Sequence, residues 1–128
     1  MTNPDQTHAA TEDPRPPIDT EWLTRMQTTK PDFLRRLFEV FLTEEPQRVA
    51  SLAAAINKHD MEMVRYLAHS LKGAAATLGM ERVRDACREL EFAAKDGDSG
   101  QFALCHQHIS SEMDAVYAVI RATMPPKA

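Results

Sequence analysis

The stretch that decides the fold of this chain runs from His69 to Gly79 and reads HSLKGAAATLG. In and just before it, apolar residues recur at spacings of three and four, the period of one helical face. They are Val64, Leu67, Ala68, Leu71, Ala75 and Leu78. At 100° per residue, His69 points about 150° away from the mean direction of this stripe. The pattern predicts an amphipathic helix over about residues 61–78, with an imidazole that faces solvent or a partner.

The neighbours of His69 on this helix are small or basic. Lys72 lies one turn further on, while Gly73 and Ala76 place almost no side chain beside the ring. A glycine inside a helix costs about 1 kcal/mol relative to alanine. Gly73 is therefore expected to admit something large close to the backbone, either a partner protein or another helix of the same chain.

Two further helical patterns precede this segment. From Asp19, the apolar residues Trp22, Leu23 and Met26 predict a short helix of two or three turns, which residues 28–30 end. Pro31 then opens a long amphipathic segment that continues to about Ile56. Pro46 lies inside it and lacks the N–H that would bond to the carbonyl four residues back. We therefore expect a kink at Pro46 and no chain reversal.

Clear start and stop signals divide the second half of the chain. Asp60 is a candidate N-cap for the His69 helix, and Gly79 suits the left-handed residue that follows a helix. Another helix is predicted over about residues 81–96, and the last one continues until Pro125. No segment alternates like a strand. The pattern predicts an all-α protein, an antiparallel up-down-up-down four-helix bundle with a short extra N-terminal helix.

Length and composition indicate one domain. The chain has 128 residues, of which 43% are hydrophobic, enough for a single core. Residues 1–17 are rich in proline and lack periodicity, which predicts a disordered tail or linker outside the fold. The bundle is then expected over residues 18–123, with a C-terminal tail over residues 124–128.

Charge and hydropathy exclude several classes of function. A net charge of -4 argues against a nucleic-acid-binding protein. The sequence shows neither a membrane-spanning apolar run nor the apolar core of a signal peptide, so we expect a cytoplasmic protein. Cys87 and Cys105 fall on apolar stripes and are expected to be buried and reduced. Residues 61–95 hold six basic and five acidic residues, a net charge of +1, which favours an acidic partner.

The chemistry predicted for His69 is nucleophilic. Near neutral pH one ring nitrogen of an ordinary histidine keeps a free lone pair and can capture a phosphoryl group. A catalytic triad is disfavoured because Ser70 points about 100° further round the helix. Metal binding is disfavoured because Arg65 and Gly73, one turn to either side, cannot ligate. Arg65, Ser70 and Ala76 are instead candidates for contact with a partner protein.

The next predicted helix carries a row of charged residues at spacings of four, three and four: Arg84, Arg88, Glu91 and Lys95. If this row faces His69, Glu91 could accept a hydrogen bond from one ring nitrogen and so fix the tautomer. Lys95 could then join Lys72 in neutralising phosphate charge. The alternative is a solvated charged row without a role in the site.

Taken together, His69, Leu71, Lys72, Gly73, Ala74, Ala75, Leu78 and Gly79 resemble the signature of histidine-containing phosphotransfer (HPt) domains. The resemblance covers about residues 18–122. It implies a four-helix bundle whose exposed histidine accepts a phosphoryl group from a receiver-domain aspartate and passes it to another receiver. It also implies a carrier without kinase activity, in which Lys72 neutralises phosphate and Gly73 allows close approach. Magnesium would belong to the receiver, and the chain would need no cofactor or metal of its own.

Two other functions remain open from the sequence. The first is a helical interaction module that only docks or sequesters a partner, and the second is a phosphoacceptor domain served directly by its own kinase. We expect a monomer whose partners are receiver domains of a hybrid sensor kinase, of response regulators, or of both.

Overall fold

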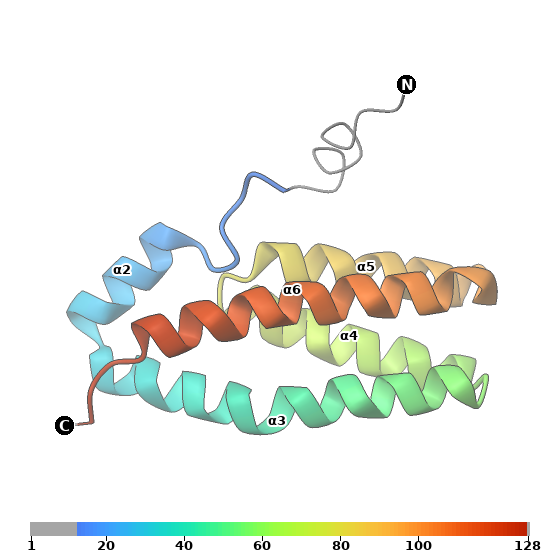
Figure 1. The fold of residues 1–128 in the computed structure, drawn as a ribbon, viewed down its shortest axis with the longest axis horizontal. Helices are drawn as coiled ribbons and strands as arrows, with labels where there is room; N and C mark the ends of the chain where they lie inside the picture. Colours follow the sequence, from blue (N-terminus) through green and yellow to red (C-terminus); the bar gives the residue numbers. More distant parts are fainter. Residues whose placement is uncertain (1–12, 128) are drawn as a thin grey trace.

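The structure, a computed structural model, describes residues 13–127. Its elements are α2 (Thr20–Thr29), α3 (Pro31–Asn57), α4 (Met61–Thr77), α5 (Glu81–Lys95), the short 3-10 helix η1 (Ser99–Gln101) and α6 (Phe102–Thr123). Over this range the structure contains helices and no strand. The four long helices lie side by side, and α2 lies across one end of the bundle (Figure 1). The predicted all-α bundle with an extra N-terminal helix is confirmed.

The four long helices pack in a closed ring. Helix α4 packs against α3 and α5, and α6 packs against α5 and α3. Short connections join consecutive members of the ring, so each helix runs antiparallel to the one before it (Figure 1). Among residues 13–127, none of the helices combines the length and apolar character that a bilayer crossing demands.

Local chemistry sets the ends of α4 as the sequence predicts. The carboxylate of Asp60 accepts a hydrogen bond of 3.2 Å from the Met63 N–H and caps the first turn. At the other end Gly79 adopts φ +68°, the left-handed conformation in which a side chain would be strained. The Gly79 carbonyl also accepts a hydrogen bond of 2.8 Å from the Asp19 N–H. The turn after α4 is therefore tied to the start of α2.

Pro46 leaves α3 undivided. Helix α3 continues from Pro31 to Asn57 with Pro46 inside it, in agreement with the expectation that this proline would not reverse the chain. One lost backbone hydrogen bond is tolerated because both halves of the helix bury apolar residues in the same core, among them Phe38 and Leu52.

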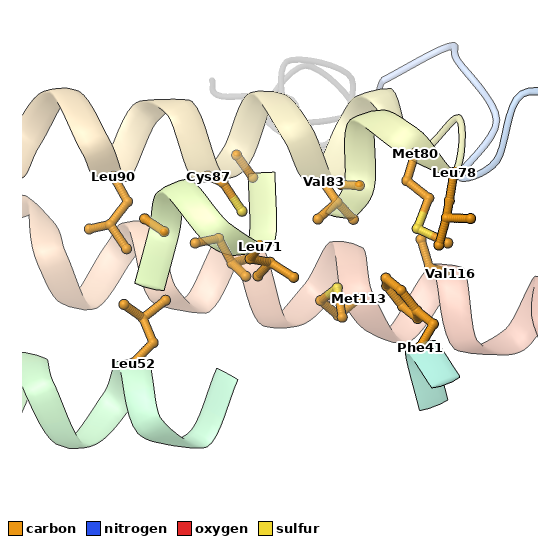
Figure 2. Packing of buried hydrophobic residues seen from close by; sticks show 14 of the residues in the cluster. Phe41, Leu52, Leu71, Leu78, Met80, Val83, Cys87, Leu90, Met113 and Val116 are labelled. Carbon is orange, nitrogen blue, oxygen red and sulfur yellow. The ribbon is translucent and has the colours of Figure 1, made fainter. Parts of the chain in front are cut away.

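The core is formed by side chains that all four long helices send inward (Figure 2). The stripe predicted for α4 faces this core, with Leu67 only partly buried and five residues buried: Val64, Ala68, Leu71, Ala75 and Leu78. Burial of each large apolar side chain contributes about 1.5–3 kcal/mol. Because this face of α4 fixes the rotation of the helix, it also determines that His69 points outward.

Two acidic residues are buried, which the apolar stripes do not predict. Glu45 on α3 is 3% exposed and forms an ion pair with Arg48. Burial raises the pKa of the Glu45 carboxyl above its usual range, against the opposing effect of Arg48. Glu112 on α6 is 7% exposed and accepts two hydrogen bonds from Arg82, of 2.6 and 3.1 Å. Each buried carboxylate is thus paired with a guanidinium group that is itself only partly buried.

Part of the segment predicted as a tail, residues 1–17, contacts the bundle in the structure. Arg15 forms an ion pair of 2.8 Å with Asp85 on α5, and its carbonyl accepts a hydrogen bond of 3.0 Å from Arg82. Residues 1–12 lie outside the described residues. The predicted C-terminal tail also contacts the bundle, because the Pro125 carbonyl accepts a hydrogen bond of 2.6 Å from Arg35. Composition alone does not reveal contacts of this kind, which join residues far apart in the sequence.

The two cysteines are free thiols. Cys87 is buried as predicted, whereas Cys105 is only partly buried. Burial, and next the charge of Glu91, raise the pKa of the Cys87 thiol from 9.0 to about 12.

The buried thiol of Cys87 should make the fold sensitive to alkaline pH. The thiol ionises near pH 9.0 in the unfolded chain, but its pKa in the folded protein is raised to about 12. The stability that the protonated thiol contributes is therefore complete below pH 9 and is lost as the pH rises towards 12. The loss approaches about 1.4 kcal/mol for each pH unit within that window. Urea unfolding between about pH 8 and pH 11 measures it. The Cys87→Ala variant should show a flatter decline than wild type and than Cys105→Ala, and equal slopes in all three would contradict this assignment.

Candidate functional site

His69 is an exposed side chain on the outer face of α4. Its side chain is 71% exposed, while the opposite face of the helix carries the fully buried Leu71 and Ala75. The rotation set by the core therefore presents the imidazole to solvent. This placement agrees with the sequence pattern, which put His69 far from the apolar stripe.

Glu91 on α5 lies between His69 and Lys72. One carboxylate oxygen, Oε2, is 3.1 Å from His69 Nδ1. The other, Oε1, is 2.6 Å from Lys72 Nζ. The Glu91 side chain is only 20% exposed and that of Lys72 29%, so both groups are held against the protein while the ring remains open. The charged row on α5 does face His69 at this position.

The contact between Glu91 and His69 determines which ring nitrogen is free. A carboxylate only accepts hydrogen bonds, so in the neutral ring the contacting Nδ1 carries the proton and donates it to Glu91. The lone pair of the neutral imidazole is then on Nε2, on the side of the ring away from Glu91. The geometry thus favours one tautomer of the neutral ring on an exposed side chain.

The other predicted site residues have different positions. Arg65 and Ala76 are exposed on α4, and Ser70 is partly buried there. Lys95 is exposed at the last residue of α5, and among residues 13–127 it forms no ion pair with the site. The structure therefore brings together His69, Lys72 and Glu91 but does not bring Lys95 into contact with them.

Gly73 lies in open space. A Cβ atom built at this position would meet no heavy atom within 4 Å. Close packing of another described helix against Gly73, one of the two explanations that the sequence left open, is therefore excluded. The other explanation, approach by a partner protein on the His69 face, stays a prediction.

Two exposed aromatic residues near this site were not predicted from the sequence. Tyr66 is 65% exposed and Phe92 is 54% exposed. The guanidinium carbon of Arg88 lies 5.3 Å from the centre of the Phe92 ring. Phe92 falls outside the apolar stripe of α5, and that signal could have identified it from the sequence.

The described residues offer no ready metal site. Over residues 13–127, no group of three or more histidine, cysteine, aspartate or glutamate side chains is arranged to hold a metal ion.

Comparison with known proteins identifies the class to which this bundle and site belong. The family model of the Hpt domain matches residues 36–122, and the chain belongs to the Hpt domain family. Proteins of this family are histidine phosphotransfer proteins that interact with receiver domains in phosphorelays.

One solved structure is similar over most of both chains. The crystal structure of histidine-containing phosphotransfer protein B (HptB) from Pseudomonas aeruginosa PAO1 superimposes with a TM-score of 0.78 at 26% sequence identity. The similarity covers 84% of this chain and 93% of that one. No sequence among the curated proteins matches the chain closely enough to count as a relative.

Proposed function

We propose that His69 accepts a phosphoryl group on Nε2 from the aspartyl phosphate of one receiver domain and passes it to the aspartate of another. The observation that carries this proposal is the exposed imidazole whose Nδ1 lies 3.1 Å from Glu91. In the neutral ring, a proton on Nδ1 in this contact would leave the lone pair on Nε2, as nucleophilic attack on phosphorus requires.

The proposed transfer exchanges one bond to phosphorus for another. The Nε2 lone pair forms the N–P bond while the bond between phosphorus and the aspartyl oxygen breaks, and the aspartate leaves as a carboxylate. The ring keeps its proton on Nδ1 and becomes positively charged, and Glu91 stabilises that charge. The same steps in reverse deliver the phosphoryl group to a second receiver. Any magnesium would be held by the receiver, so we propose that this chain supplies no metal or cofactor.

The role proposed for Glu91 is to position the ring. It acts through His69 and does not touch phosphate, because its second oxygen already contacts Lys72 at 2.6 Å. The ring ¹⁵N chemical shifts of His69 in the free protein should report a protonated Nδ1 and an unprotonated Nε2 at alkaline pH. The opposite tautomer would exclude this role.

Lys72→Ala should slow transfer without abolishing it. The ammonium group lies one turn from His69 and can reach the phosphoryl oxygens, whose charge must be neutralised during transfer. Loss of one such contact at a partly exposed position should lower the rate about tenfold. Rates of uptake from a phosphorylated receiver measure this effect, with Lys58→Ala on the turn before α4 as a matched loss of charge. A rate unchanged from wild type would remove Lys72 from the site.

Substitutions at Gly73 should separate stability from function. Gly73→Ala should stabilise the fold by about 1 kcal/mol, because alanine is the better helix former and the added methyl meets no atom within 4 Å. Gly73→Leu should keep the fold but slow transfer, because its side chain would stand beside the imidazole where the receiver approaches. Urea unfolding and uptake rates measure the two effects, with Ala54→Leu on the exposed face of α3 as control. Unimpaired transfer by Gly73→Leu would exclude close approach at this position.

The proposed partners are receiver domains of a hybrid sensor kinase, of response regulators, or of both. Arg65, Ser70 and Ala76 surround His69 on α4 and would contact them, and Lys95 would add positive charge at the rim. We propose that the chain works as a monomeric carrier in the cytoplasm and has no kinase activity of its own.

A transfer experiment tests the proposed function. A panel of purified receiver domains, each phosphorylated with acetyl phosphate, is incubated with the chain. Phosphate that appears on the chain should be acid-labile and base-stable, as phosphohistidine is. A module that only docks or sequesters receivers would bind them and acquire no phosphate, and that result would refute the proposal.

A further inference from the structure

Two exposed aromatic side chains flank His69. Tyr66 precedes it by three residues on α4, about 4.5 Å along the helix axis. Phe92 directly follows Glu91, whose carboxylate contacts the His69 ring. Both aromatic rings are more than half exposed, at 65% and 54%. Since exposed aromatic residues are enriched where proteins dock, the position of this pair beside the site needs an explanation.

Arg88 extends the Phe92 side of this arrangement. Its guanidinium group lies over the Phe92 ring at 5.3 Å, a geometry that orders the side chain by cation–π attraction. Two other arginines of α5 are occupied, Arg82 by Glu112 and Arg84 by Asp85. Within residues 13–127, Arg88 has neither an ion pair nor a side-chain hydrogen bond of its own. Its planar set of donors is therefore ordered, exposed and available for a carboxylate.

The size of a docked receiver brings it to Arg88 and Phe92. A specific interface covers about 800 Å² on each partner, roughly a circle of 16 Å radius. A receiver whose phosphorylated aspartate meets His69 Nε2 is centred on that ring. Because Glu91 contacts the ring, and Arg88 and Phe92 lie within one turn of Glu91 on α5, a footprint of this size would reach both residues. The surface is thus continuous with the transfer site.

We propose that Arg88 and Phe92 together bind an acidic side chain on the surface of the receiver domain and determine which receivers the chain serves. The guanidinium group would hold the carboxylate in a two-point contact, and the Phe92 ring would cover its apolar stem. Tyr66 anchors the opposite edge of the same footprint. The inference rests on the proposed function, since it takes the receiver as the occupant of this surface.

Transfer kinetics test the inference with a receiver from the panel that phosphorylates the wild-type chain. Arg88→Ala and Phe92→Ala should each raise the receiver concentration that gives half-maximal rate by about tenfold. The maximal rate should stay unchanged, because neither residue touches the reacting atoms. Arg88→Lys should recover only part of the loss, since lysine keeps the charge but lacks the planar donors. Leu104→Ala is the control, because Leu104 is likewise an exposed apolar residue, at 65%, but lies on α6.

Specificity is read across the whole panel. Arg88→Glu should change the order in which the chain accepts phosphate from different receivers, because it repels an acidic side chain and favours a basic one. Unchanged half-maximal concentrations in Arg88→Ala and Phe92→Ala, with wild-type transfer intact, would overturn the inference alone. A lower maximal rate at unchanged half-maximal concentration would also overturn it. Failure of every receiver to phosphorylate the wild-type chain would instead contradict the proposed function.

Discussion

His69→Gln is expected to abolish phosphoryl uptake from every receiver that phosphorylates the wild-type chain. Glutamine has a similar size and polarity, but its amide nitrogen has no available lone pair and cannot attack phosphorus. The phosphate recovered on the variant should equal that of a blank reaction. No other substitution discussed for this chain should reduce transfer as much, because no other group forms a bond to phosphorus.

The same variant should fold as wild type does. The His69 side chain is 71% exposed and contributes nothing to the core, so the free energy of unfolding should change by less than about 0.5 kcal/mol. Circular dichroism during urea unfolding measures this change. His108→Gln on α6 is the matched control and should accept phosphate normally. Full uptake by His69→Gln would refute the assignment of His69 as the phosphoacceptor.

Arg82→Ala is expected to cause a larger loss of stability than any other single substitution proposed for this chain. Arg82 donates two hydrogen bonds to Glu112, of 2.6 and 3.1 Å, and a third to the Arg15 carbonyl. Without Arg82, the Glu112 carboxylate would lose its guanidinium partner and keep, among the described residues, only the contact of 3.6 Å with His108 Nε2. Removing the main partner of a buried charge should cost about 3 kcal/mol, which urea unfolding measures.

A double variant shows whether that cost comes from the charge left behind. Arg82→Leu combined with Glu112→Leu removes both charged groups and should recover most of the lost stability, because apolar residues of similar volume can replace a buried ion pair. Arg84→Ala is the control, since Arg84 is 40% exposed and, within residues 13–127, pairs only with the adjacent Asp85. A double variant as unstable as Arg82→Ala would show that the hydrogen bond to Arg15 matters more than the buried charge.

The parts of this fold that follow helical periodicity could be predicted from the sequence. The apolar stripe of α4 fixes the rotation of that helix, and so it also predicts an exposed His69. Asp60 and Gly79 mark the ends of α4 because capping and the left-handed conformation depend on single residues. These signals are local, and one sequence is enough to read them.

Contacts between helices could be predicted only conditionally. The spacing of charged residues on α5 offers both Glu91 and Lys95 to the site, but packing brings only Glu91 to His69. The spacing of residues along one helix shows which of them share a face. Which residue of that face contacts a given neighbour depends on how the two helices pack against each other. The burial of Glu45 and Glu112 was not predicted for a related reason. An acidic residue is expected to be exposed unless a basic partner is known, and the sequence does not show which arginine lies beside it.

The contacts of Arg15 bear on where this protein can be shortened. The bundle begins by helical periodicity near residue 18, yet Arg15 pairs with Asp85 and its carbonyl holds Arg82. A fragment that begins at the first helix would lack Arg15. Asp85 and Arg82 on α5, the helix that supplies Glu91, would then each lose a partner. Protein produced for kinetic measurements should therefore retain the chain from residue 13 onward.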